Sequence, residues 1–186
     1  MSDFDQAIPV ILKHEGGLAD NPADPGGITN YGISLRYLHS LVQQDPSLLS
    51  IYDVDHQGEI DGVDIRDLPE QDAIQIYKMQ WWDKNNYGLI NDQALSTKIF
   101  DLAVNIGTIT ANKFLQRACN QVAGNVLLMI DGIIGLQSIA VINKLDPAAV
   151  LAGLRKLAKN YYENLAVEHP ALQQFLNGWL NRLADA

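Results

Sequence analysis

The first apolar stripe of the chain has helical spacing and leads to a carboxylate. Five side chains fall on one face of a helix, namely Phe4, Ile8, Ile11, Leu12 and Glu15. Ser2 can cap the start of this helix, with Asp5 three residues further on. Gly16-Gly17 ends it by supplying permissive backbone. The pattern therefore predicts a helix that carries Glu15 in its last turn.

Helical spacing also dominates the rest of the chain, whereas strand signals are weak. Residues 18–33 are rich in proline, glycine and polar residues, so we expect an irregular loop or a small hairpin there. Ser34 can cap the next helix, which stops before Asp45-Pro46. Further helices are expected at residues 69–82, 95–106, 111–122, 136–145, 147–167 and 171–183. The predicted fold class is mainly α.

The composition is that of a globular protein, and it narrows the choice of partners. Hydrophobic residues make up 47% and charged residues 19% of the 186 residues, as in ordinary folded domains. The formal charge of −9 provides no basic stripe for phosphates, so nucleic acid and anionic membranes are disfavoured. The single cysteine, Cys119, excludes an internal disulfide framework and cannot by itself make a zinc site.

No stretch has the composition of a flexible linker, a repeat or a membrane span. We expect one compact monomeric unit made of two lobes, at residues 1–95 and 96–186. The acidic N-terminus lacks the apolar run of a signal peptide, and no later run approaches ~20 apolar residues.

Two carboxylates near the predicted loop suit the cleavage of a glycosidic bond. This reaction needs a protonated acid beside the leaving oxygen, and an inverting enzyme also needs a base that activates water. Glu15 ends an apolar face, which favours its uncharged form, whereas Asp24 lies on a polar loop and would stay ionised. Thr29 could orient the water. The structural alternative is stronger for either carboxylate alone, because a helix-end Glu and an Asp before proline are both common.

The surrounding residues resemble a known family along nearly the whole chain. The similar segments are residues 11–17, 24–33, 76–77, 81–82 and 100–107. They look like the signature of glycoside hydrolase family 108, which includes phage-type N-acetylmuramidases and secretion activator proteins. The resemblance implies a lysozyme-like fold of two lobes, with a small irregular or hairpin region beside the catalytic helix. It also implies that Glu15 takes the place of the catalytic acid.

The second half of the proposed site rests on spacing. Glu15 and Asp24 match the Glu-x8-Asp arrangement of one class of phage lysozymes, in which five residues separate the Asp from a Thr. Here four residues intervene before Thr29, and Asn30 has the equivalent spacing. We prefer Thr29 because its loop context matches. Further along, residues 131–135 resemble the Asp-Gly-x-x-Gly turn of wall-binding modules, which implies a peptidoglycan-binding region in the C-terminal half.

Residues 53–64 have the spacing of a calcium loop. Oxygen-bearing side chains occupy positions one, three, five, nine and twelve, with Glu59 among them and Gly58 at the sixth position. The candidate ligands are Asp53, Asp55, Gln57, Glu59, Asp61 and Asp64. A calcium ion here would be structural, and the chemistry itself needs no cofactor. The alternative is a solvated acidic turn that caps a helix beginning near Asp67.

Aromatic and buried polar residues are candidates for binding the glycan. Sugars stack on aromatic rings, which points to Tyr31, Trp82 and Tyr87; on the predicted helix, Trp82 faces away from the apolar stripe and could reach solvent. Asp101 and Asn105 lie one turn apart on an apolar helix, where substrate groups could satisfy them. The alternative for this pair is stabilisation of the helix end at Gly107.

The resemblance, together with the carboxylate pair, implies an N-acetylmuramidase that cleaves between N-acetylmuramic acid and N-acetylglucosamine in peptidoglycan. One alternative is a lytic transglycosylase, in which a single Glu serves as acid and base. Another is a wall-binding or secretion-accessory protein without turnover. A phage endolysin and a bacterial secretion activator would need the same chemistry. Without a visible signal peptide, we expect synthesis in the cytoplasm and passage to the wall or periplasm through a holin or a dedicated exporter.

Overall fold

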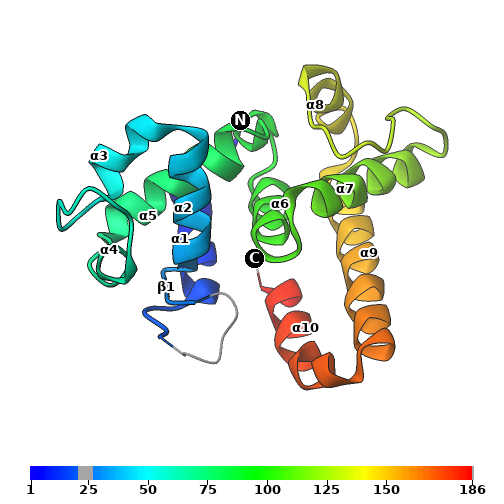
Figure 1. The fold of residues 1–186 in the computed structure, drawn as a ribbon. Helices are drawn as coiled ribbons and strands as arrows, with labels where there is room; N and C mark the ends of the chain where they lie inside the picture. The colour runs from blue at the N-terminus through cyan, green and yellow to red at the C-terminus, as the bar shows by residue number, and fades with distance from the viewer. Residues whose placement is uncertain (21–26, 186) are drawn as a thin grey trace. The chain divides into compact units, whose positions relative to one another are not determined.

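The computed structural model of the chain describes residues 1–20 and 27–185, and it is mainly helical (Figure 1). The predicted fold class is therefore confirmed, including a small hairpin beside the first helix. The strands are β1 (Thr29–Asn30) and β2 (Ile33–Ser34), which pair antiparallel. The α-helices are α1 (Phe4–Glu15), α2 (Leu35–Gln44), α3 (Leu49–Tyr52), α4 (Gly62–Arg66), α5 (Glu70–Tyr77), α6 (Gln93–Ile106), α7 (Thr108–Ala123), α8 (Leu136–Ile142), α9 (Pro147–Glu168) and α10 (Leu176–Ala184).

Shorter helical turns complete the connections. The 3-10 turns are η1 (Pro46–Leu48), η3 (Tyr87–Leu89) and η4 (Pro170–Phe175), and η2 (Lys78–Asp83) is a π-helix that continues α5. None of the described helices combines the length and the apolar character that crossing a membrane would need.

The chain divides into two compact units, and each is described by itself. The larger unit combines residues 1–11 with residues 78–186, and the smaller unit is residues 12–77. The boundary that we expected at residue 95 falls in the first turn of α6, inside the larger unit. Helix α1 contributes its first eight residues to the larger unit and its last turn, with Glu15, to the smaller one.

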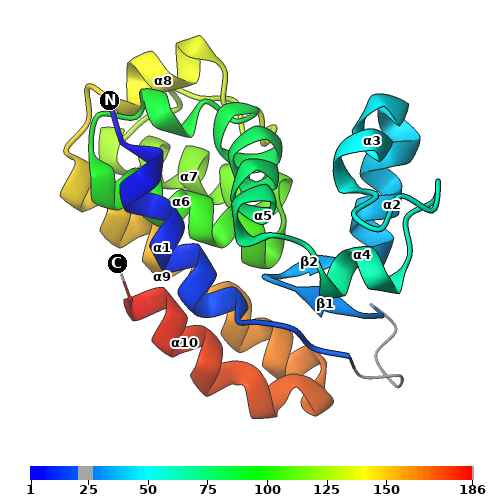
Figure 2. The same ribbon diagram turned by 90° about the vertical axis from the view of Figure 1, so that its left-hand side faces the viewer.

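In the smaller unit the hairpin is joined to α4 by a buried amide. Asn30, which is 6% exposed, donates from Nδ2 to the carbonyl of Ile65 at 3.0 Å and to that of Arg66 at 3.3 Å. Figure 2 shows β1 and β2 beside α4. As expected, Ser34 caps α2, and its Oγ accepts a 3.1 Å hydrogen bond from the backbone N–H of Tyr37. These contacts hold the hairpin in one orientation against its own unit.

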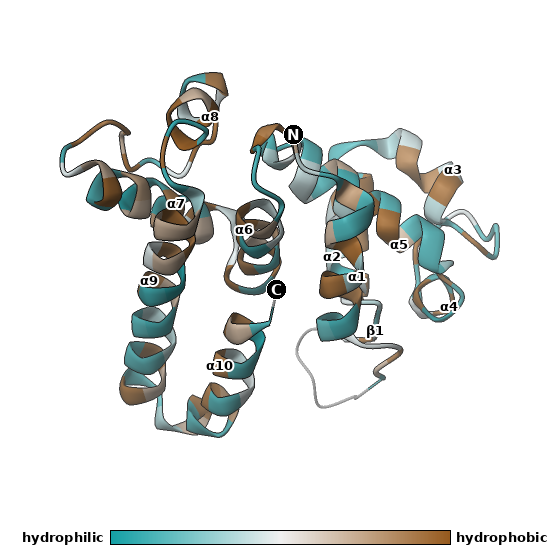
Figure 3. Cartoon of the chain, turned by 180° about the vertical axis from the view of Figure 1, so that it is seen from behind, coloured by the Kyte–Doolittle hydropathy of each residue, from teal (hydrophilic) through white to brown (hydrophobic). Residues whose placement is uncertain are grey.

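In the larger unit α6 packs against α7 and α9, and α10 returns alongside α9 (Figure 1). Large apolar side chains fill the space between these helices, with Phe100, Leu115 and Leu154 all 0% exposed. Cys119 also lies in this core, where burial raises the pKa of its thiol to about 12. The segment between α7 and α8 is different, because apolar residues there face solvent, as the brown ribbon in Figure 3 shows.

The start of α1 differs from the prediction. The backbone N–H of Asp5 donates to the carboxylate of Asp3 at 2.9 Å, so Asp3 rather than Ser2 satisfies a helix-end donor. The Ser2 hydroxyl instead donates to the carbonyl of Ile90 at 2.6 Å. A partner 88 residues away in the sequence therefore replaces the local cap that spacing alone suggested.

Candidate active site

Glu15 is the last residue of α1, and its half-buried side chain lies against the turn of the β-hairpin. The closest approach is at Gly32. A Cβ placed on Gly32 would lie 2.8 Å from both Cβ and Oε2 of Glu15. A Cβ atom does not approach non-bonded atoms so closely, so only glycine at position 32 leaves room for this placement of the carboxylate.

The turn itself has a conformation that favours glycine at two successive positions. Asn30 pairs with Ile33, so Tyr31 and Gly32 form a two-residue hairpin loop with φ values of 49° and 76°. Positive φ at both positions is typical of a type I′ turn, which matches the twist of the strands. A bulky residue such as Tyr31 rarely adopts this conformation, because its Cβ approaches the backbone closely.

Tyr77, the last residue of α5, holds the turn in place. Its hydroxyl donates a 2.9 Å hydrogen bond to the carbonyl of Tyr31. Its Oη would lie 2.5 Å from a Cβ on Gly32, so the hydroxyl and the Glu15 carboxylate flank the same glycine. The ring is 1% exposed, so it is a rigid support from the core of the smaller unit. Helical spacing alone did not single out this contact, because the spacing of Tyr77 is that of any core residue.

The strand alternation separates the two candidates for orienting water. The Asn30 side chain is directed to α4, where the carbonyls of Ile65 and Arg66 engage it. Neighbouring residues of a strand point to opposite faces, so Thr29 lies on the other side of the hairpin and is half-buried. As the candidate for orienting water, Thr29 is therefore favoured over Asn30, whose amide is already bonded to α4.

Backbone pairing also joins residues on either side of the segment that contains Asp24. Ala19 and Thr29 form an isolated bridge, with N–H donors at 2.8 Å and 2.9 Å to each other's carbonyls. Arg66 donates to the carboxylate of Asp20 at 2.9 Å. The loop therefore begins and ends at fixed points. Asp24, the proposed base, lies outside the described residues.

Three of the predicted glycan-binding residues lie in the core of the larger unit. Trp82 is 4% exposed and packs edge-on against Phe4 and Phe100, with ring centroids 5.7 Å and 5.4 Å apart. The prediction that Trp82 reaches solvent is wrong because η2 is a π-helix, whose wider turn rotates residues 78–83 relative to an α-helical continuation of α5. Trp81 is half-buried and is the more exposed of the two.

Tyr87 is fully buried and belongs to a polar network. Its hydroxyl donates to Oδ1 of Asn112 at 2.7 Å, and Asn112 donates in turn to Asn85 at 3.1 Å and to the carbonyl of Gly132 at 3.0 Å. Burial raises the pKa of the Tyr87 hydroxyl. Its ring presents no face to a sugar, so the expected role in binding is corrected to a structural one.

Asp101 is satisfied by protein cations rather than by substrate. The carboxylate is 1% exposed, lies 3.3 Å from Nζ of Lys98 and accepts a 2.9 Å hydrogen bond from Nε of Arg182. Desolvation lowers the pKa of Lys98, and the neighbouring Asp101 carboxylate opposes that shift. The prediction that substrate groups bind the Asp101 carboxylate is therefore wrong. Asn105 is half-buried and lines a cavity, so it alone of this pair can contact a ligand.

The acidic loop brings three of its six predicted ligands together. Oxygen atoms of Asp53, Asp55 and Asp64 all lie within 4.8 Å of one another. Desolvation raises the pKa of Asp55, as do the nearby carboxylates of Asp64 and Asp61. Asp61 caps α4 by accepting from Val63 at 2.6 Å. Gln57 and Glu59 are exposed, and the Glu59 carboxylate is not part of this cluster.

The loop backbone also has the form that a calcium loop needs. Gly58, at the sixth position, has a φ of 90°, and Ile60 at the eighth is 4% exposed. Helix α4 begins directly after Asp61, earlier than the helix that we expected near Asp67. Hard oxygen donors that converge around a sharp glycine turn fit a divalent cation.

Comparison with known proteins defines the class. The family model described as "Glycosyl hydrolase 108" matches residues 8–107, and the model described as "Predicted Peptidoglycan domain" matches residues 110–184. The first match covers more than half of the chain. The protein is thus a glycoside hydrolase. It belongs to glycosyl hydrolase family 108 and is a peptidoglycan hydrolase with a peptidoglycan-binding region, as the sequence resemblance implied.

A solved structure supports the same assignment. The structure of SagA from Brucella abortus aligns with a TM-score of 0.71 and 25% sequence identity, covering 97% of this chain and 89% of that one. No curated protein matches the chain. The similarity extends over both regions that the family models match.

Proposed function

We propose that the protein is an N-acetylmuramidase that hydrolyses the bond between N-acetylmuramic acid and N-acetylglucosamine, with Glu15 as general acid. The observation that carries the proposal is the position of the Glu15 carboxylate. It ends α1 against the Tyr31-Gly32 turn, within the part of the chain that the glycosyl hydrolase model matches. An acid held in place by packing against a fixed turn can deliver its proton in one geometry.

Asp24 is the proposed base, and Thr29 the residue that orients water. Glu15 gives its proton to the glycosidic oxygen as the bond to the anomeric carbon breaks. Water adds to that carbon from the opposite face, and its proton goes to Asp24. One water is consumed, and the new reducing end has inverted configuration. The bridge between Ala19 and Thr29 supports this assignment, since it fixes both ends of the loop that contains Asp24.

Muropeptide analysis tests the proposal. Wild type should release reducing ends from purified peptidoglycan, and Glu15→Gln should release them at least a hundredfold more slowly, since general acid catalysis contributes about 10²–10⁴-fold. Glu168→Gln, at the exposed end of α9, is the matched control and should retain activity. Equal rates for wild type and Glu15→Gln would refute the assignment.

The same products separate the alternative mechanisms. A lytic transglycosylase forms an anhydro sugar, which is lighter by one water than the hydrolysis product, and mass spectrometry resolves the two. Proton NMR of the first anomer formed distinguishes inversion from retention. Loss of wall material from neither wild type nor variant would instead favour a wall-binding protein without turnover.

We also propose that the loop of residues 53–64 binds calcium for a structural purpose. Asp53, Asp55 and Asp64 supply the converging oxygens, and Gly58 makes the turn. Asp64 replaces the bidentate Glu that usually closes such loops, so we expect weaker binding than in a complete site. A bound ion would offset repulsion among the carboxylates and link α3 to α4 within the smaller unit.

A further inference from the structure

The larger unit contains a cavity of about 220 Å³ where the end of α6 meets α9 and α10. Its walls come from three helices that are far apart in sequence but packed together. The lining residues are Asn105, Ile106, Tyr161, Tyr162, Leu165 and Trp179. Half of them are aromatic, and one carries a side-chain amide.

The aromatic walls are fixed by ring contacts. Trp179 stacks on Tyr162 with centroids 5.4 Å apart and an interplanar angle of 23°. Tyr161 packs edge-on against Tyr162 at 5.8 Å and against Phe114 at 5.7 Å. Rings held in this way need little further ordering when a ligand binds, so binding costs less conformational entropy.

The amide of Asn105 is oriented by the same cluster. The hydroxyl of Tyr162, which is 2% exposed, donates a 2.7 Å hydrogen bond to Oδ1 of Asn105. The carbonyl end of the amide therefore points to Tyr162, and the NH₂ group is the end left to donate to a ligand in the cavity. The buried hydroxyl thus orients the half-buried amide, so that its NH₂ group can donate a hydrogen bond into the cavity.

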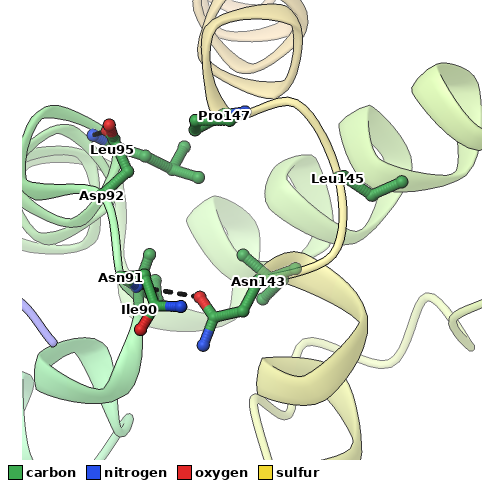
Figure 4. A pocket seen from close by; sticks show the side chains of 8 residues that line it. Ile90, Asn91, Asp92, Leu95, Asn143, Leu145 and Pro147 are labelled. Carbon is green, nitrogen blue, oxygen red and sulfur yellow. Dashed lines mark hydrogen bonds between the residues drawn. The ribbon is translucent and has the colours of Figure 1, made fainter.

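Two other observations bear on which ligand fits. The cavity combines two residues from the region that the glycosyl hydrolase model matches, Asn105 and Ile106, with residues from the peptidoglycan-domain region. By contrast, the cavity in Figure 4, between residues 90–95 and 142–147, measures about 40 Å³. The backbone N–H of Asn91 and Oδ1 of Asn143 already bond across it at 2.8 Å, so it has room for water rather than for a sugar ring.

We propose that the Asn105–Trp179 cavity binds one N-acetylated sugar of the glycan strand. The apolar face of the pyranose stacks on an aromatic wall, and the acetamido carbonyl accepts a hydrogen bond from the NH₂ group of Asn105. The cavity is smaller than the ~300–1,000 Å³ of pockets that enclose drug-sized ligands, which suits one ring and its acetyl group. The inference deepens the proposed function, on which the choice of glycan rests.

Binding can be measured without cleavage in the Glu15→Gln protein. The probe is the tetramer of N-acetylglucosamine, followed by tryptophan fluorescence because Trp179 lines the cavity. Adding Trp179→Phe should remove the emission change while calorimetry still detects binding, which assigns the signal to this cavity. Purified insoluble peptidoglycan in a pelleting assay provides a second probe.

Two added variants remove different parts of the recognition. Asn105→Asp keeps an acceptor for Tyr162 but loses the NH₂ donor, and Tyr161→Leu removes an aromatic wall. Each should weaken binding of the tetramer about tenfold. Asn160→Asp adds the same charge at an exposed neighbouring position of α9, and its affinity should not change. Circular dichroism and thermal unfolding identify any variant that fails to fold, and Tyr161→Leu decides the question if Asn105→Asp does.

A further variant tests whether the sugar binds elsewhere, on the solvent-facing apolar segment between α7 and α8. Met129 lies in that segment and is 77% exposed, so Met129→Ala alters this surface and leaves the cavity intact. Unchanged affinity in both cavity variants overturns the inference, as does weaker binding of Met129→Ala alone. Neither result affects the muramidase proposal, which the reducing-end assay of wild type and Glu15→Gln decides separately.

Discussion

The hydroxyl of Tyr77 donates to the carbonyl of Tyr31 at 2.9 Å, and this bond connects α5 to the turn that contacts Glu15. Tyr31 has a φ of 49°, a conformation that costs a non-glycine residue roughly 1–2 kcal/mol. The hydrogen bond offsets part of that cost. Tyr77 is thus a positioning residue, which acts on Glu15 through the hairpin turn.

Removing the Tyr77 hydroxyl should therefore affect the rate more than substrate binding. We expect Tyr77→Phe to lower kcat about tenfold with little change in KM, and to lower the free energy of unfolding by about 1 kcal/mol. Steady-state kinetics and urea unfolding measure the two effects. Tyr52→Phe is the matched control, because the buried Tyr52 hydroxyl has no hydrogen bond to a described residue. A rise in KM at constant kcat would contradict the positioning role.

The contact at Gly32 predicts a larger effect. An alanine there would place Cβ 2.5 Å from Oη of Tyr77 and 2.8 Å from Glu15, at a φ of 76°. We expect Gly32→Ala to lose about 1–3 kcal/mol of stability and most of its activity. Gly124→Ala has the same backbone strain, at a φ of 71°, with nothing within 4 Å of the new Cβ. If the two variants lose activity equally, the loss in Gly32→Ala does not come from close packing at Glu15.

Calcium binding predicts a metal-dependent stability. Calcium at about 100 times its dissociation constant should raise the free energy of unfolding by about 2.7 kcal/mol, and a chelator should reverse the gain. Thermal unfolding with and without calcium measures it. Asp55→Asn should reduce the calcium effect, whereas Asp5→Asn, in the first turn of α1, should not. A wild-type protein whose unfolding is insensitive to calcium would rule out the site.

The buried ion pairs of Asp101 predict a strong stability effect. Asp101→Asn leaves Lys98, which is 0% exposed, without its carboxylate partner, and breaking a buried pair costs about 3–5 kcal/mol. Lys78 and Asp83 form a 2.7 Å pair whose side chains are 40% and 51% exposed. Asp83→Asn should cost about 0–1 kcal/mol. Similar costs in urea unfolding would show that the Asp101 network contributes little.

Local patterns predicted much of the fold and the convergence of carboxylates in the acidic loop. The period of apolar residues located α1, α2 and the helices after residue 93. The glycines after Glu15 located the helix end, and the spacing of the aspartates located a loop whose oxygens do converge. Each of these features depends on residues within about a dozen positions of one another.

The errors came from interactions over long sequence distances or from altered helix geometry. Arg182 is 81 residues from Asp101, so spacing could not reveal that a cation satisfies this carboxylate. Trp82 is buried because residues 78–83 form a π-helix, whereas the prediction from helical periodicity assumed an α-helix throughout. The aromatic cavity joins α6, α9 and α10, and the spacing of residues within one helix could not show that these three helices meet there.

The turn at residues 131–135 predicts how stability depends on pH. Oδ1 of Asp131 accepts 2.8 Å hydrogen bonds from Nε2 of Gln116 and from the backbone N–H of Ile133. The bond from Gln116, followed by that from Ile133, lowers the pKa of Asp131 in the folded state. Because the folded pKa lies below the unfolded one, the charged carboxylate stabilises the fold above about pH 4, and this contribution is lost as the pH falls through the folded pKa.

Asp131→Asn should therefore be less stable than wild type at neutral pH, and the difference should shrink in acid. Urea unfolding of both proteins between about pH 2.5 and pH 7 measures it. Gln116→Met removes the main donor and should flatten the same part of the wild-type profile. A difference between wild type and Asp131→Asn that persists undiminished at the acid end would mean that packing of the turn, and not the charge of Asp131, stabilises it.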